Sequence, residues 1–324
     1  MKQLLLALVL ASSCGAAQPV QKSQTRTTQP AATPQSTGAK KIDRARLLED
    51  VRTLSSDAME GRGAGTKGGE MARAYVEGRF KELGLAPLWD SYEQPFDLPK
   101  GGKGFNVVGY VKGTKYPERL VVVSAHYDHL GVRNGQIYNG ADDNASGVAV
   151  LLQLAAHYAG AARPEHSMVF AALDAEEIGL VGARELVKRL KAEKRDVALD
   201  VNMDMVGHND RGELYASGVY YTPALKPSLE RVAAGAPVKL LLGHDRPEQG
   251  HDDWTNQSDQ YAFYKAGIPF VYFGVEDHKD YHKPTDDYET LTLDFFVGAA
   301  ETVLDAVETL DAELEAATKA GAKK

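Results

Sequence analysis

The sequence predicts an α/β protein of three layers, with helices on both faces of a mixed, mostly parallel central sheet. Four apolar runs, at residues 120–125, 168–173, 197–204 and 268–273, lack the polar alternation of a strand with one wet face. Each is therefore expected to be a central strand that is covered on both sides. Helical segments lie between these runs, and this alternation of strand and helix is typical of a layered α/β domain.

Five segments are predicted to be helices, residues 47–60, 68–85, 146–160, 179–193 and 293–317. The second of these is predicted to end at Gly84, because glycine commonly terminates helices. The last is an amphipathic helix close to the C-terminal end of the sequence.

Composition restricts the class of protein and its partners. The 324 residues are enough for one large α/β domain after a leader, and 43% hydrophobic and 25% charged residues are ordinary for a globular protein. A net charge of -8 without a clustered basic segment argues against a nucleic-acid partner. Cys14 is the single cysteine, so no disulfide can form within the chain.

Residues 1–17 are predicted to be a signal peptide, because a short apolar run follows Lys2 and small residues come next. Either cleavage follows Ala17, or the segment is a lipoprotein signal that ends before Cys14, which would then carry a lipid that tethers the protein to a membrane. Residues 18–41 are rich in Gln, Thr, Ser, Pro and Ala and are expected to be a disordered linker. We therefore expect residues 42–324 to form the folded domain of an exported protein that is secreted, periplasmic or a cell-envelope lipoprotein.

Acids and histidines follow the predicted strands where each strand ends. They are His126, Asp128 and His129 after the first, Asp174, Glu176 and Glu177 after the second, Asp204 at the end of the third, and His278, Asp280 and His282 after the fourth. Asp142 and Asp143 precede a predicted helix in the turn NGADDNASG. Ligands of open parallel sheets bind at the carboxyl ends of the strands, so we expect these side chains to gather at one edge.

Imidazoles and carboxylates without a thiolate suit zinc, and also manganese or cobalt. Several carboxylates and two histidines can hold two metals that share one carboxylate, and such a pair activates water and polarises a carbonyl. The expected reaction is therefore hydrolysis. Simpler interpretations exist for each residue: a local hydrogen bond for His126 and Asp128, a helix cap for Asp143 or Ser146, a core ion pair for Asp204, and an unremarkable loop position for His282.

Five motifs occur in the order SAHYDHLG, GADDNASG, DAEEIGLVGA, NMDMVG and DYHKPTDDYETL. In this order they resemble the M28 family of co-catalytic zinc aminopeptidases, in particular its secreted bacterial members. The resemblance extends from about Ile42 to the C-terminal helix. It implies the α/β/α sandwich of the zinc peptidases, which is similar to that of the phosphorylase/hydrolase proteins.

The resemblance also implies a role for each matching residue, with two zinc ions per chain or manganese or cobalt in their place. Its metal ligands are His126 and Asp204 for one ion, Glu177 and His282 for the other, and Asp143 as the bridge between them. Glu176 is the implied general base, Asp128 orients the first histidine, and Tyr281 hydrogen-bonds the oxyanion. The expected activity is that of an exopeptidase in which a metal-bridging hydroxide attacks the N-terminal peptide bond of peptide substrates.

Other activities remain open on the same pattern. A carboxypeptidase, a dipeptidase or an amide deacylase could use the same two-metal centre, and Arg133 and Lys283 are candidate cations for a substrate carboxylate. A glutaminyl cyclase would use a single zinc. A binding module of the cell envelope that had lost its activity would be expected to lack one of the ligands or the base.

Overall fold

The computed structural model describes residues 42–160 and 162–321, and side chains are described as far as residue 317. The predicted signal peptide, Cys14 and the linker at residues 18–41 lie outside these residues. Among the described helices, none combines the length and the apolar character needed to cross a bilayer.

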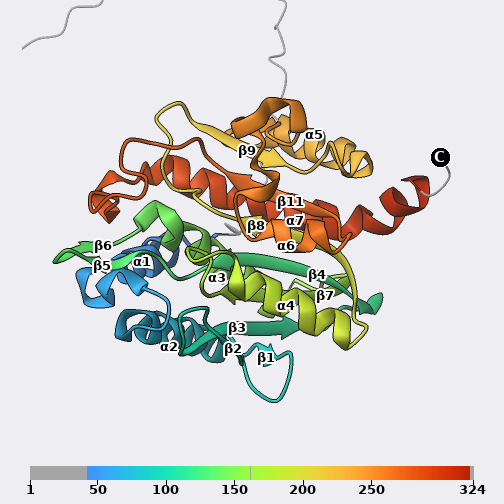
Figure 1. Ribbon diagram of the computed structural model, residues 1–324. Coiled ribbons are helices and arrows are strands. Elements are labelled where there is room, and N and C mark those ends of the chain that lie inside the picture. Colours follow the sequence, from blue (N-terminus) through green and yellow to red (C-terminus); the bar gives the residue numbers. More distant parts are fainter. Residues whose placement is uncertain (1–41, 161, 322–324) are drawn as a thin grey trace, which may run out of the picture. The chain divides into compact units, whose positions relative to one another are not determined.

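A mixed sheet of nine strands forms the centre of the domain, in the order β1-β3-β7-β4-β8-β11-β9-β10 with β2 paired to β3 (Figure 1). The strands are β1 Ala86–Pro87, β2 Glu93–Asp97, β3 Lys103–Val111, β4 Tyr116–His126, β7 His166–Leu173, β8 Asp196–Met203, β9 Glu213–Ser217, β10 Lys239–Leu242 and β11 Phe270–Gly274. The central strands β7, β4, β8 and β11 are parallel to one another. Strands β3 and β9 flank them in antiparallel pairings. A separate hairpin joins β5 Gly131–Arg133 to β6 Gln136–Tyr138.

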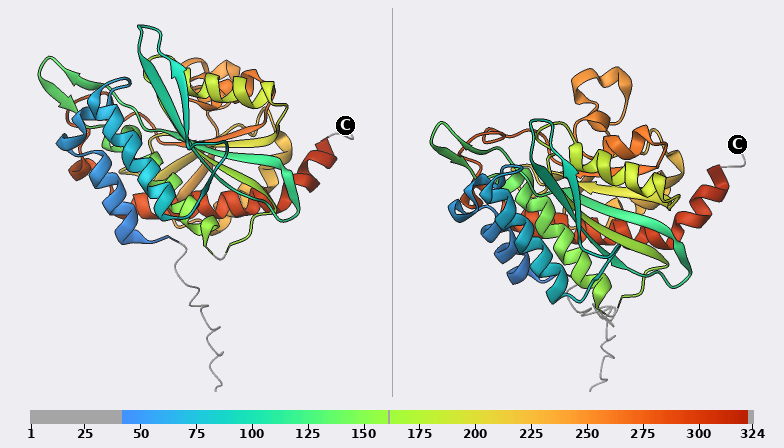
Figure 2. Two further views of the ribbon diagram at one scale, coloured as in Figure 1. Left: turned by 90° about the horizontal axis from the view of Figure 1, so that it is seen from below. Right: turned by 60° about the horizontal axis from the view of Figure 1, so that its bottom comes forward.

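Helices cover both faces of this sheet, which confirms the predicted three-layer α/β fold (Figure 2). The helices are α1 Arg44–Leu54, α2 Lys67–Glu82, α3 Gly147–Ala159, α4 Val181–Ala192, α5 Lys226–Gly235, α6 Gln260–Lys265 and α7 Leu293–Gly321. Helices α1, α2, α3, α5 and α7 contribute to the larger hydrophobic core on one face. Helices α4 and α6 pack on the other face.

Strand β4 shows why the central strands carry no polar alternation. Val121 and Val123 point into the core beneath α3, whereas Leu120 and Val122 point into the core beneath α4. Successive side chains of a strand point to opposite faces, so a strand between two helical layers must be apolar at every position. All four of these side chains are buried.

Two details differ from the expectation. The helix predicted over residues 47–60 ends at Leu54, where the Ser55 hydroxyl donates to the carbonyl of Val51, and a short 3₁₀ segment follows at Asp57–Arg62. The strands β1, β2, β3, β9 and β10 were not predicted, and neither were α5 and α6. These elements are short, lie at the sheet's periphery, or combine apolar residues with glycine and polar positions.

Candidate metal centre

The structure brings the predicted ligands together at the carboxyl edge of the central strands. His126 is the last residue of β4, and Asp204 directly follows β8. The His126 Nε2 atom lies 3.2 Å from Asp204 Oδ1 and 3.4 Å from Asp143 Oδ1. These three residues form one half of the cluster, and all are buried.

The other half of the cluster lies on the opposite side of Asp143. His282 Nε2 is 3.1 Å from Asp143 Oδ2 and 3.3 Å from Glu177 Oε2. Glu177 comes from the loop between β7 and α4, and His282 from the segment that follows β11. One oxygen of Asp143 therefore faces each half, as a bridging carboxylate requires.

His129 also belongs to this second half, although the sequence comparison assigned it no role. Its Nδ1 atom lies 2.7 Å from Glu177 Oε1 and 3.6 Å from Asp143 Oδ2. The ring is fully buried, with its centroid 5.8 Å from that of His282. Its place in the motif SAHYDHLG was the only signal available, and that motif does not say which of its histidines turns toward Glu177.

The Asp128 carboxylate hydrogen-bonds to the backbone of Glu176, the predicted base, and lies farther from His126. Its Oδ1 atom accepts a hydrogen bond of 3.0 Å from the Glu176 amide. The Nδ1 atom of His126 lies 3.1 Å from the backbone carbonyl of Asp128, and the carboxylate oxygen is farther away, at 3.7 Å. The carbonyl is thus the nearer partner of the imidazole, while the carboxylate fixes the backbone at Glu176.

The alternative in which Asp143 or Ser146 caps α3 is wrong. Asp143 lies in the turn Ala141–Ser146 before that helix, and neither side chain accepts from its first amides. The amide of Gly147 instead donates to Asn144 Oδ1, at 2.9 Å. The carboxylate of Asp143 is therefore left free to face the cluster.

Arg62 organises the loops beneath the cluster, a role that no sequence pattern indicated. Its guanidinium is fully buried and donates to the carbonyls of Leu54, Tyr127, Asn139 and Gly140. Burial lowers its pKa to about 10, so the group stays charged at neutral pH. One side chain thus ties the segment before Asp128 to the turn before Asp143.

Burial and crowded carboxylates determine the protonation of the cluster. Burial opposes ionisation of Glu177, but its contacts with His129 and His282 outweigh this effect and lower the pKa of the carboxyl well below its usual value. Burial also acts against the charged form of His282, yet contacts with Asp143 and Glu177 raise its pKa to about 10. The pKa of His126 rises well above its ordinary value because neighbouring carboxylates outweigh its burial. The carboxylates of the cluster thus favour positive charge beside them, and a metal ion would take the place of these protons.

The residues present fit zinc. Nitrogen and oxygen donors converge from several loops without a thiolate, which matches the ligand preference of a catalytic zinc site. Glu177 Oε1 and His129 Nδ1 lie 2.7 Å apart without the alignment of a hydrogen bond, and the other ring nitrogen of His129 is buried with no hydrogen-bond partner among the described residues. Buried polar atoms are seldom left in this state, and a metal ion held by these residues would satisfy them.

A pocket of about 300 Å³ opens beside the cluster. Its lining consists of Asp143, Glu176, Glu177, Gly179, Leu180, Asp204, Met205, Trp254, Gln257, Tyr272, Val275, Asp277, Tyr281 and His282. Burial raises the pKa of Glu176 well above its usual range, and a divalent cation nearby would oppose that shift. The Tyr281 ring stacks on His282, with centroids 4.0 Å apart. Substrate entering this pocket would meet the predicted base, the predicted oxyanion donor and the metal ligands together.

Solved structures and curated proteins resemble this chain. A probable zinc metalloprotease of Pyrenophora teres f. teres is 30% identical over 275 residues, which cover 74% of this chain and 54% of that protein. The zinc aminopeptidase BSAP of Bacillus subtilis superposes with a TM-score of 0.68 at 18% identity, over 82% of this chain and 94% of that chain. A glutaminyl cyclase of Fimbriiglobus ruber superposes with a TM-score of 0.65 at 19% identity, over 83% and 95%. The chain spans about half the length of the Pyrenophora relative.

The sheet is mixed, and its carboxyl edge carries imidazoles and carboxylates around one shared carboxylate. This is the arrangement of an α/β metallopeptidase. The chain belongs to peptidase family M28, because the model of that family matches residues 106–307.

Proposed function

We propose that this protein is a zinc-dependent aminopeptidase, which removes residues from the N-termini of peptides. The observation that carries this proposal is the charge of the pocket beside the metal centre. Its carboxylates include one, on Asp277, that neither the metals nor the general base require. A carboxylate in this position suits the α-ammonium group of a substrate, which a free N-terminus provides.

The cations that a carboxypeptidase would need do not line this pocket. Among the described lining residues there is neither lysine nor arginine. Lys283 Nζ is exposed and donates to the carbonyl of Lys279. Arg133 is exposed on the β5–β6 hairpin, where its Nε donates to the Leu130 carbonyl. The two basic candidates of the sequence are thus engaged elsewhere.

Two zinc ions are proposed for the cluster, the first held by His126 and Asp204 and the second by Glu177 and His282. Asp143 would serve both, because its two oxygens face opposite halves. Zinc, when bound, lowers the pKa of a coordinated water and polarises a carbonyl. Glutaminyl cyclisation at a single zinc would leave one half of this cluster without a function.

Glu176 lies in the pocket without being needed as a ligand, and we assign it the proton transfers. Its carboxylate takes a proton from the attacking water and passes it to the leaving amine. The hydrogen bond from its amide to Asp128 fixes the backbone that carries it. Tyr281 lines the same pocket, and its phenol would donate to the carbonyl oxygen as negative charge develops there.

Four apolar side chains belong to the lining of the pocket. Leu180, Met205, Trp254 and Val275 line it, and each is at least nine-tenths buried. Burial of an apolar side chain stabilises a complex in proportion to the area removed from water. We therefore expect N-terminal leucine, methionine or phenylalanine to be preferred over charged residues.

Comparing substrates with free and blocked amines tests the proposal. The zinc-loaded protein should cleave leucine p-nitroanilide with a kcat/KM about 10- to 100-fold higher than that for N-acetyl-leucine p-nitroanilide, because the blocked amine cannot pair with Asp277. Asp277→Asn should raise KM for the free amine with little effect on the blocked substrate. Asp210→Asn is the matched control, since Asp210 does not line this pocket. Equal cleavage of both substrates, or removal of C-terminal residues from a tripeptide, would overturn the proposal.

A further inference from the structure

Trp254 lines the pocket beside the metal centre, and buried hydrogen bonds connect its backbone to the central sheet. It begins the short 3₁₀ segment Trp254–Asn256, which lies between the exposed segment Pro247–Asp252 and helix α6. Trp254 itself is only 7% exposed and belongs to the lining of the pocket. Because the segment before it contributes nothing to the core, other contacts must set the position of its indole ring.

The first of these contacts is a bridge made by the side chain of Gln260, in α6. Gln260 Nε2 donates to the Trp254 carbonyl at 2.7 Å, and Gln260 Oε1 accepts from Asn202 Nδ2 at 3.0 Å. Both amide side chains are fully buried. A Gln260 side chain turned away from these partners would leave a buried donor and a buried acceptor unpaired, which is costly. The bridge therefore fixes the distance between Trp254 and Asn202.

From Asn202 the hydrogen bonds continue across two strands of the sheet. Asn202, on β8, has its Oδ1 atom 3.1 Å from the Ser124 hydroxyl on β4, and that hydroxyl lies 2.9 Å from Asp200 Oδ1. Burial raises the pKa of Asp200 well above its usual range, so this carboxyl carries a proton at neutral pH. Asp200 can then donate to Ser124, and the single hydroxyl proton of Ser124 goes to Asn202. The chain thus runs in one direction, from the sheet to the Trp254 carbonyl.

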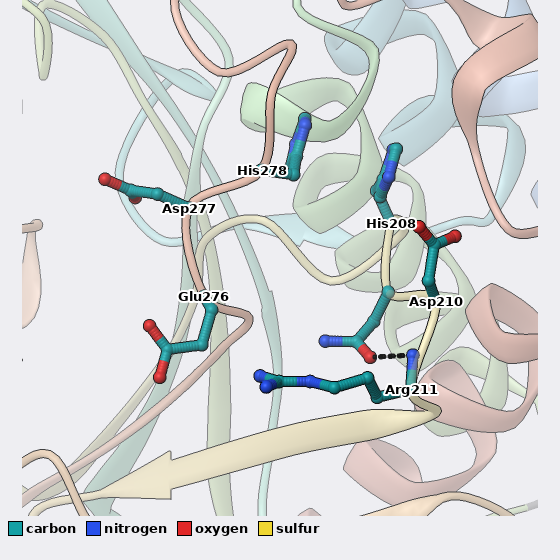
Figure 3. A pocket seen from close by; sticks show the side chains of 7 residues that line it. His208, Asp210, Arg211, Glu276, Asp277 and His278 are labelled. Atoms are coloured by element: carbon teal, nitrogen blue, oxygen red, sulfur yellow. Dashed lines mark hydrogen bonds between the residues drawn. The ribbon is translucent and has the colours of Figure 1, made fainter.

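The other contact of Trp254 lies on the face of its ring and reaches the surface. The His244 ring stacks on the indole, with centroids 3.7 Å apart and an interplanar angle of 7°. His244 Nε2 lies 3.3 Å from Glu276 Oε1, and the Glu276 side chain is 42% exposed. Figure 3 shows Glu276 next to Asp277, in the lining of a neighbouring pocket of about 540 Å³. An exposed pair of this kind contributes little, so the buried Gln260 bridge is the stronger restraint.

We propose that Gln260 is a positioning residue for substrate selection. It holds the Trp254 carbonyl and so fixes the indole as a surface on which an apolar N-terminal side chain packs. A surface that is already ordered does not have to be immobilised when substrate binds. The preference for leucine over glycine therefore depends on Gln260, which does not itself line the pocket. This inference rests on the proposed aminopeptidase activity.

Gln260→Met tests the proposal, because methionine has a similar length but makes neither hydrogen bond. The ratio of kcat/KM for leucine p-nitroanilide to that for glycine p-nitroanilide should fall about 2- to 10-fold, the equivalent of one hydrogen bond. The fall should appear as a higher KM for the leucine substrate, with kcat and zinc content unchanged. An equal loss of kcat on both substrates would indicate a merely structural role and overturn the proposal.

Gln94→Met is the matched control. Gln94 is also buried, donates to the Glu185 carbonyl at 3.0 Å and accepts from Asn106 Nδ2 at 3.0 Å. It lies on β2 and not in the lining of the pocket. This variant loses the same two kinds of hydrogen bond, yet its leucine-to-glycine ratio should match that of the unmodified protein.

Tryptophan fluorescence tests the bridge without relying on activity. Trp89 and Trp254 are the two tryptophans of the sequence, so Trp89→Phe leaves Trp254 as the single reporter. In that background, acrylamide should quench the emission of Trp254 more strongly after Gln260→Met, because the segment is no longer held against the sheet. Unchanged quenching, or an unchanged leucine-to-glycine ratio, in a folded variant would overturn the proposal.

Two further results keep the test decisive. If circular dichroism shows that Gln260→Met does not fold, Gln260→Asn replaces it, since asparagine is one methylene group too short to bridge both partners. Failure of the unmodified protein to cleave any aminoacyl p-nitroanilide would refute the proposed function. The quenching measurement would then still decide whether Gln260 positions Trp254.

Discussion

Glu176→Ala is expected to lower kcat about 10²- to 10⁴-fold, the range that a general acid–base typically contributes, while leaving the zinc content unchanged. Glu176 lines the pocket beside the cluster, but neither half of the cluster needs it as a ligand. Its removal takes away the group that moves protons and leaves the metal ligands in place. The measurement is steady-state hydrolysis of leucine p-nitroanilide by protein whose zinc content has been determined.

The neighbouring glutamate is the matched control. Glu177→Ala should lose both zinc and activity, because Glu177 Oε2 lies in the half of the cluster around His282. The two adjacent residues would divide these tasks, because Glu177 belongs to the cluster whereas Glu176 belongs to neither half of it. Full activity in Glu176→Ala would rule out Glu176 as the base. Zinc loss in Glu176→Ala, with zinc retained in Glu177→Ala, would mean that the two roles are reversed.

Arg62→Met is expected to lower the free energy of unfolding by about 3–5 kcal/mol, because buried backbone acceptors would be left without a donor. Methionine fills much of the space but donates no hydrogen bond, so four backbone carbonyls lose their donor. Each buried carbonyl that is left without a donor costs about 1–3 kcal/mol of stability. Part of this loss is offset, because folding no longer has to desolvate the guanidinium. Urea unfolding of the zinc-free protein measures the change.

Arg44→Met is the control for this substitution. Arg44 pairs with Asp294 at 2.7 Å, and both side chains are exposed. Exposed ion pairs contribute about 0–1 kcal/mol, so this variant should unfold almost as the unmodified protein does. If Arg62→Met were destabilised no more than Arg44→Met, the guanidinium would not organise the loops that carry Asp128 and Asp143. Arg62→Met is also expected to bind zinc with lower affinity, because Arg62 organises the loops that carry Asp128 and Asp143.

The parts of the fold that could be predicted from the sequence are the strands that are buried on both faces. Strands β4, β7, β8 and β11 lie between helical layers and so consist of continuous apolar runs. Strand β3 pairs with three other strands, yet its sequence includes Asn106 and two glycines and resembles an irregular segment. The buried Asn106 amide donates to Gln94 and to the Gly182 carbonyl, contacts between segments distant in sequence.

The residues of the candidate site that could be predicted from the sequence are those that lie at strand ends or in recognised motifs. His126 and Asp204 follow from the rule that ligands gather at the carboxyl ends of parallel strands. Arg62 could not be predicted in this way, because a fully buried arginine is rare and its partners are carbonyls of remote loops. His129 stands in a recognised motif, but its approach to Glu177 depends on the turn that follows β4.

The central claim is that two zinc ions share Asp143, and anomalous diffraction at the zinc absorption edge tests it most directly. Crystals of the zinc-loaded protein should show two peaks beside this carboxylate. One peak is expected next to His126 and Asp204, and the other next to Glu177 and His282. The same map would show whether His129 or His282 completes the second half. A single peak on one side of Asp143, at full occupancy, would contradict the two-metal centre and favour a mononuclear enzyme.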